Sequence, residues 1–195
     1  MKIVLLILSV FISQIVLSQE KEATLIFHDS TTVEGLGEIR KNIIIFRAGK
    51  NAKKLDWSYD LVKGIQFTED GYDETFQYVQ IDKYSKPVLL EVIDEGKVTL
   101  YKGYYTQHNN ITGGSPTALL GNVQLLNSDQ STKYYLKRPY EEYASDFSNK
   151  SFEKSYSKYF SDCEALVTRI QKHKYTKEDV IDLVEFYNNY CEAEE

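Results

Sequence analysis

Residues 87–101 read PVLLEVIDEGKVTLY, and this stretch decides the fold because it predicts an antiparallel pair of strands. From position 88 to 93, successive side chains would point to opposite faces of a strand, and the same period of two returns over 98–101. Asp94-Glu95-Gly96 between the two runs is a turn signal, since glycine accepts the positive φ that short hairpin loops require. The stretch therefore predicts a β-hairpin.

Similar runs precede this hairpin at intervals of about 8–12 residues. Strands are predicted over residues 23–28, 32–39, 42–47, 61–67 and 74–80. Gly35 and Gly37 in the second run predict a bulge or a tight bend. No helix-length segment intervenes to permit parallel crossovers, so neighbouring strands should be antiparallel. A long loop over 107–115 and a last strand over 131–138 complete a β-rich body, expected to be a sandwich or a barrel-like sheet.

The period of the apolar residues changes from two to that of a helix after about residue 140. A short helix is predicted over 150–160, and two more should begin at the capping boxes Ser161–Glu164 and Thr176–Asp179. The fold class is therefore α+β. We predict a β-rich body over 19–140 and a helical unit over 141–195, which should pack on the sheet through Phe152, Tyr156, Phe160 and Ile170.

The two cysteines lie at matching ends of the last two predicted helices. The four-residue connector 172–175 should make these helices antiparallel. Cys163 then opens one helix and Cys191 closes the other, with arms of about 14 Å and 21 Å from the connector. This geometry favours a disulfide, which would contribute roughly 3 kcal/mol of stability. Two free buried thiols or a metal site are weaker alternatives, because His173 lies at the opposite end.

The first residues predict export. A lone Lys2 precedes a mostly apolar run, and Val16 and Ser18 suit a signal-peptidase site, so residues 1–18 are predicted to be a cleaved signal peptide. A retained membrane anchor would need about 20 apolar residues and usually basic flanks, whereas Glu20 and Glu22 follow here. The predicted location is the periplasm or the outside of the cell. The formal net charge of −6 argues against nucleic acid and anionic lipid as partners.

Two sets of residues carry a resemblance. They are Tyr159-Phe160-Ser161-Asp162-Cys163 with Tyr190-Cys191 near the C-terminus, and Asp29-Ser30-Thr31 with Glu34-Gly35 near the start of the mature chain. In these motifs the chain resembles uncharacterised small secreted proteins of Bacteroidota-type bacteria. The resemblance covers most of the chain after the leader. It implies secretion and a disulfide, and it assigns no catalytic residue.

Catalytic motifs with known spacing are absent from the sequence. It contains no G-x-S-x-G, no H-E-x-x-H and no P-loop pattern. The weak candidates for a site are His28 beside Asp29, which could orient the imidazole, and His108 in the long loop. The acidic turn over 69–74 lacks the spacing of a calcium loop. The sequence therefore indicates no cofactor and no metal.

These observations favour a non-enzymatic secreted or periplasmic binding module over an enzyme. Its partner could be a protein, a glycan or a small apolar ligand, and the oligomeric state is open. Two alternatives remain: a small hydrolase-like enzyme with an unrecognised site, and a structural component of the cell envelope.

Overall fold

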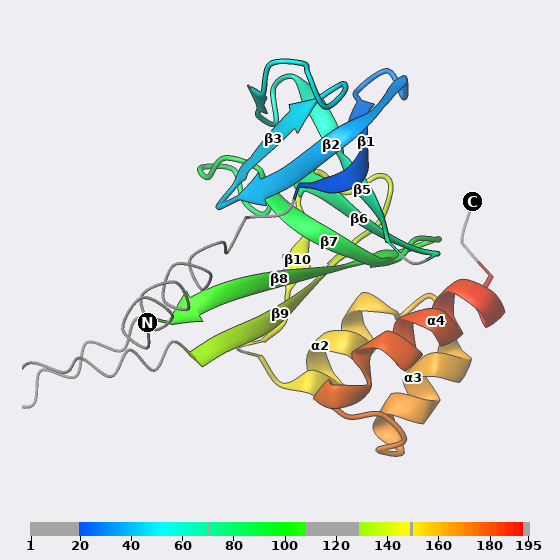
Figure 1. Cartoon of the computed structure of the whole chain (residues 1–195). Coiled ribbons are helices and arrows are strands. Elements are labelled where there is room, and N and C mark those ends of the chain that lie inside the picture. The colour runs from blue at the N-terminus through cyan, green and yellow to red at the C-terminus, as the bar shows by residue number, and fades with distance from the viewer. Residues whose placement is uncertain (1–19, 70, 108–128, 149, 193–195) are drawn as a thin grey trace, which may run out of the picture. The chain divides into compact units, whose positions relative to one another are not determined.

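Figure 1 shows a computed structural model of the chain, which describes residues 20–69, 71–107, 129–148 and 150–192. The described residues form ten antiparallel strands, a C-terminal group of helices and one disulfide, so the predicted α+β class is confirmed. The chain divides into two compact units, residues 1–73 and 74–195. The predicted signal peptide and the residues 108–115 of the predicted loop lie outside the described residues.

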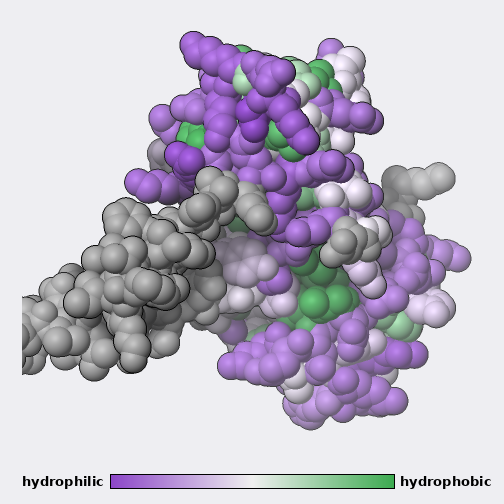
Figure 2. All heavy atoms as spheres, in the orientation of Figure 1, coloured by the Kyte–Doolittle hydropathy of each residue, from purple (hydrophilic) through white to green (hydrophobic). Residues whose placement is uncertain are grey.

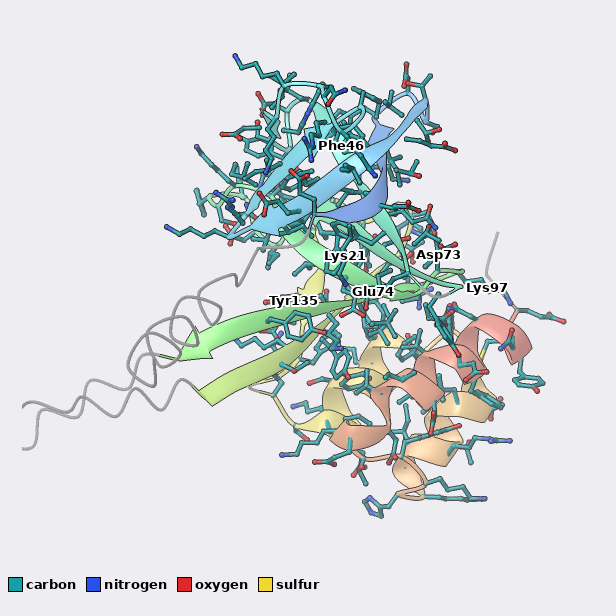
Figure 3. The ribbon with its side chains drawn as sticks, in the orientation of Figure 1. Lys21, Phe46, Asp73, Glu74, Lys97 and Tyr135 are labelled. Carbon is teal, nitrogen blue, oxygen red and sulfur yellow. A yellow bond between two sulfur atoms is a disulfide. The ribbon has the colours of Figure 1, made fainter. Side chains whose placement is uncertain are left out.

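The first unit holds five strands: β1 (Lys21–Phe27), β2 (Thr32–Arg40), β3 (Ile43–Arg47), β4 (Leu55–Trp57) and β5 (Val62–Glu69). They lie in the order β5-β1-β2-β3-β4, and each pairs with its neighbour in antiparallel register. Apolar side chains at alternate positions are buried, as the period of two predicts. Leu25, Ile44 and Ile65 are fully buried, and Phe46, labelled in Figure 3, is nearly so.

The two glycines of β2 do not form the predicted bulge. The registers of β2 against β1 and against β3 run without interruption through both positions. A Cβ at Gly35 would overlap the carbonyl oxygen of Arg47, and one at Gly37 would lie 2.5 Å from Cδ1 of Ile65. Glycine is needed here because neighbouring groups approach the backbone closely, so the prediction of a bulge was wrong.

The second unit holds the other strands: β6 (Tyr72–Val79), which begins at the boundary, β7 (Val88–Asp94), β8 (Thr99–Gln107), β9 (Asp129–Lys137) and β10 (Ser145–Asp146). Their order is β10-β9-β8-β7-β6. The hairpin predicted over 87–101 is confirmed as β7 and β8, with an irregularity in its register between Val92 and Asp94. Sequence patterns predicted neither β4 nor β10, which have three and two residues.

The helical part contains α2 (Phe152–Tyr159), α3 (Glu164–Gln171), the 3₁₀ turn η2 (Lys177–Asp179) and α4 (Val180–Tyr190). Figure 1 shows these helices beside β8 and β9. Their apolar faces pack with Val98, Leu100 and Leu136 of the hairpin region and β9 into one buried cluster. The four residues predicted to make this contact belong to it: Tyr156, Phe160 and Ile170 are buried within it, and Phe152 packs against it.

Of the two predicted capping boxes, the second is confirmed. The Asp179 carboxylate accepts hydrogen bonds from the backbone amide of Thr176 at 2.8 Å and from its hydroxyl at 2.7 Å. The first box is wrong, because α3 begins only at Glu164, after Cys163, and has no side-chain cap. The Asp162 carboxylate binds an arginine instead.

The predicted disulfide is confirmed. Cys163 and Cys191 are bonded, with Cα atoms 5.6 Å apart, and both lie in the buried cluster. No cysteine of the described part of the chain is free. The Lys97 ammonium, labelled in Figure 3, donates to the backbone carbonyl of Cys191 and so ties the end of α4 to the β7–β8 turn. Among the described helices, none has the length and apolarity needed to cross a membrane.

Candidate functional site

Arg138 anchors a hydrogen-bond network in the second unit. It directly follows β9, and only 8% of it is exposed. Its Nη1 and Nη2 donate to Oδ2 and Oδ1 of Asp162, both at 2.9 Å, which is the bidentate geometry that guanidinium and carboxylate favour. Nη2 also donates to the carbonyl of Tyr159 at 2.9 Å. The guanidinium is therefore occupied by groups of the protein itself.

Two tyrosines complete this network. The Tyr187 hydroxyl accepts from Arg138 Nη1 at 2.7 Å and donates to Asp162. Burial, together with the hydrogen bond to the Asp162 carboxylate, raises the pKa of Tyr187 to about 12. The Tyr159 hydroxyl donates to Glu141 at 2.8 Å, and burial and this bond raise its pKa as well. Both hydroxyls therefore stay protonated at neutral pH and act as fixed donors.

The pKa of Asp162 is shifted in the opposite direction. Burial alone would raise it, but hydrogen bonds from Arg138 and Tyr187 and the charge of Arg138 outweigh burial and lower it. Glu141 is likewise occupied, since its Oε2 accepts from the Arg138 backbone amide at 2.7 Å and from Tyr159. Both carboxylates of this region hold the β9–α2–α3 junction together.

A cleft of about 780 Å³ opens beside this network. This volume lies within the range of small-molecule sites, roughly 300–1,000 Å³. Its lining mixes hydroxyls and charged groups with the aromatic rings of Tyr140, Phe147 and Tyr159. The lining residues are Arg138, Tyr140, Glu141, Ser145, Phe147, Lys150, Ser151, Lys154, Ser155, Lys158, Tyr159, Ser161 and Asp162. We refer to this site as the lysine cleft.

Three lysines give the cleft its charge. Lys150, Lys154 and Lys158 follow one another at intervals of four residues, so the last two lie on one face of α2, about 6 Å apart along its axis. All three are exposed, and no ion pair within the described part of the chain involves them. Like charges at this spacing cost an isolated helix about 0.2–0.5 kcal/mol per pair. An anion bound between them would remove that repulsion.

The two carboxylates of the cleft are engaged by other groups of the protein. No histidine is among the described residues that line it. Asp162 is held ionised by Arg138, and Glu141 already accepts two hydrogen bonds, so neither is placed to take a proton from one of the serines. In Figure 2 the surface of the helical part, in the lower half of the view, is mainly hydrophilic.

The residues singled out from the sequence lie elsewhere. His28 and Asp29 belong to the first unit, directly after β1. His28 Nε2 lies 2.9 Å from the carbonyl oxygen of Tyr59, while Asp29 Oδ1 accepts from the amide and hydroxyl of Thr31 at 3.0 and 2.6 Å. These bonds lower the pKa of Asp29 and shape the turn. His108 lies outside the described residues.

Sequence reasoning missed the lysine cleft, although a signal for it exists. Residues 150–158 read KSFEKSYSK, in which Lys-Ser recurs after four residues and a third lysine follows after four more. On a helix this period places the repeated side chains on one face. Arg138 and Asp162 gave no such signal, because 24 residues separate them. Within the described residues, no group of three His, Cys, Asp or Glu side chains could hold a metal ion.

Comparison with known proteins returned no match: no family model fits the chain, and neither a curated protein nor a solved structure is significantly similar to it.

Proposed function

We propose that this protein is a non-enzymatic binding module that works outside the cytosol and holds an anionic ligand in the lysine cleft. One observation carries this proposal. A chain with a formal net charge of −6 gathers three exposed lysines along one wall of a cleft, where their charges repel one another. The two carboxylates of that cleft are already bound by Arg138 and Tyr159, so they compete weakly for the lysines.

The location outside the cytosol rests on the disulfide and on the predicted signal peptide. Cys163–Cys191 closes a loop of 28 residues within the buried cluster, and disulfides of this kind persist in oxidising compartments. The resemblance to small secreted proteins of Bacteroidota-type bacteria agrees with export. Secretion and periplasmic retention are both compatible with these observations.

The lining favours a charged ligand over the other partners considered. A small apolar ligand could contact the rings of Tyr140, Phe147 and Tyr159, but it would also desolvate serine hydroxyls and ammonium groups, which would oppose its binding. A hydrolase would need a poised base, and neither carboxylate of the cleft is available for that role. A structural role in the envelope would not by itself account for the lysines.

A polyanion matrix tests the proposal. At pH 7.5 the protein, with a pI of about 5.2, should be repelled as a whole by immobilised polyvinylsulfonate, a polyanion without sugar rings, so that retention would report a local basic site. We expect retention at low ionic strength that is lost as salt screens the charges. A double variant, Lys154→Ala with Lys158→Ala, should elute earlier at lower salt.

The matched control is Lys83→Ala with Lys86→Ala, which removes the same charge from two exposed lysines of the second unit that lie outside the lysine cleft. This control should elute with the wild type. If the wild-type protein passes through unretained, or if both double variants lose retention equally, the lysine cleft is not an anion site and the proposal fails.

A further inference from the structure

We propose that the ligand of the lysine cleft is an acidic oligosaccharide, a sugar chain that carries carboxylate groups or sulfate esters. This inference rests on the proposed function and narrows it to a ligand class. The size of the cleft, the type of its cations, its hydroxyls and one exposed aromatic ring carry the argument.

The size of the cleft favours an occupant larger than a lone inorganic ion. One water molecule takes up about 30 Å³ in the liquid, so a volume of about 780 Å³ accommodates a molecule of many heavy atoms. The lysines are spread along this volume, with Lys154 and Lys158 about 6 Å apart along the helix. A ligand with anionic groups repeated along its length matches that distribution.

Apart from Arg138, the described cations of the cleft are lysine ammonium groups, and these suit a ligand that carries separate anionic groups along a flexible chain. Arg138 is the planar, bidentate cation of the cleft, and Asp162, Tyr187 and the Tyr159 carbonyl already accept from both of its terminal nitrogens. The lysines that remain are point charges with rotatable donors, which meet a carboxylate or sulfate from many directions. Tight recognition of a compact phosphate cluster would be better served by a free arginine fork.

The hydroxyls of the lining suit a sugar. Four serines, at positions 145, 151, 155 and 161, line the cleft together with Tyr140 and Tyr159. Each serine hydroxyl can both donate and accept, as can each hydroxyl of a sugar ring. Ser151 is the N-cap of α2, yet its hydroxyl makes no capping hydrogen bond. An acidic peptide would gain less, because its carboxylate side chains carry no hydroxyls to pair with the serines of the lining.

Tyr140 supplies an aromatic face. It lines the cleft and is 79% exposed, although it lies only two positions after the buried Arg138. A single exposed tyrosine needs no explanation by itself, but this one shares the cleft with the three lysines. An aromatic ring is rigid, and its negative face attracts the weakly positive C–H groups of a pyranose. Tyr140 is therefore placed to stack on a sugar ring while the lysines bind its charges.

Calorimetric titration of the purified, disulfide-bonded protein tests this inference. The probes are trigalacturonate, sulfated maltotriose, neutral maltotriose, inorganic sulfate and a triglutamate peptide. We expect at least one acidic trisaccharide to bind about tenfold or more tightly than maltotriose, inorganic sulfate and triglutamate. Tyr140→Ala should weaken that binding about two- to tenfold, with retention on the polyanion matrix preserved.

One control variant and three possible outcomes separate the inference from the proposed function. Tyr190→Ala removes a tyrosine of similar exposure, 75%, outside the cleft, and should bind the sugar like the wild type. If triglutamate binds as tightly as the acidic sugars, the sugar inference is wrong and the anion site stands. If maltotriose binds as tightly as its sulfated form, charge does not select the ligand and both proposals fall. Absence of binding to every trisaccharide, with retention on the polyanion matrix intact, also overturns the sugar inference alone.

Discussion

At the scale of single residues, Asp162 shows how a local shift in pKa becomes a dependence of stability on pH. Its carboxylate is paired with Arg138 and Tyr187, and its pKa is lowered below the ordinary value of 3.8. A carboxylate whose pKa is lower in the folded state than in the unfolded state stabilises the fold. This contribution is complete at a pH above the unfolded-state pKa, and it is lost as the pH falls through the folded-state pKa. Asp162 therefore makes the protein more stable at pH 6 than at pH 3.

The variant Asp162→Asn should reduce this difference, because its amide does not titrate. Urea unfolding at pH 6 and pH 3 measures the two free energies for each protein. We expect the variant to be less stable than the wild type at pH 6, by about 3–5 kcal/mol, since Arg138 would then lie buried without its counter-charge. The fully exposed turn residue Asp29, changed to Asn, is the control and should alter the pH difference much less. Equal pH differences in wild type and Asp162→Asn would contradict the assignment.

At the scale of elements, Asn188 joins α4 to the β7–β8 hairpin. Its Oδ1 accepts from the amide of Val98 at 3.0 Å, and its Nδ2 donates to the carbonyl of Val98 at 2.9 Å and to Asp94 at 2.8 Å. The side chain thus pairs with Val98 as a neighbouring strand would. Gly96 permits this approach, because a Cβ there would lie 2.6 Å from Cγ of Asn188.

Asn188→Ala should lower the free energy of unfolding by about 1–3 kcal/mol, because the amide and carbonyl of the buried Val98 lose their partners. Denaturant titration gives this value, and Asn189→Ala, at the exposed neighbouring position, should change it by less than about 0.5 kcal/mol. Similar losses in both variants would show that the contact with Val98 is not responsible, since helix propensity by itself would make both alanine variants more stable.

The period of the apolar residues and the chemistry of turns and helix caps were enough to predict most of the strands and helices, and the disulfide. The alternation in residues 87–101 predicted β7 and β8, and Thr176 and Asp179 predicted the start of the last helix, because these signals act within a few residues. Long-range partners account for the errors. Turn chemistry predicts a positive φ at Gly96. Among the described glycines, the one with a positive φ is Gly71. Gly96 is needed for a different reason, because the side chain of Asn188 lies against it. The cap predicted at Ser161–Glu164 does not form, and the neighbouring Asp162 binds the distant Arg138.

The candidate site was predicted less well than the fold. Sequence motifs directed attention to His28, Asp29 and His108, whereas the lysine cleft combines residues after β9 with residues of α2 and the start of α3. Its lysines are visible in the pattern KSFEKSYSK, but the same pattern is typical of any solvated helix face. The lysines could line a cleft or belong to an ordinary solvated helix face, and only the position of α2 next to the Arg138 network distinguishes these two interpretations.

At the scale of the whole molecule, the disulfide and its surroundings belong entirely to the second unit. Cys163, Cys191 and the cluster around them lie between residues 98 and 191, while Leu25, Ile44 and Ile65 are buried in the first unit. Reduction should lower the stability of the second unit by about 3–4 kcal/mol, the chain-entropy value for a 28-residue loop. The loss should be concentrated in α3, α4 and the β7–β8 turn, where Lys97 and Asn188 hold the end of α4.

Amide hydrogen exchange, followed by residue in the oxidised and reduced protein, measures this distribution. We expect faster exchange in α3 and α4 after reduction and unchanged protection in β1, β2 and β3. A Cys163→Ser, Cys191→Ser double variant should reproduce the pattern without reductant. If protection falls equally in both units, the chain unfolds as one cooperative body, and the disulfide then stabilises the first unit as much as the second.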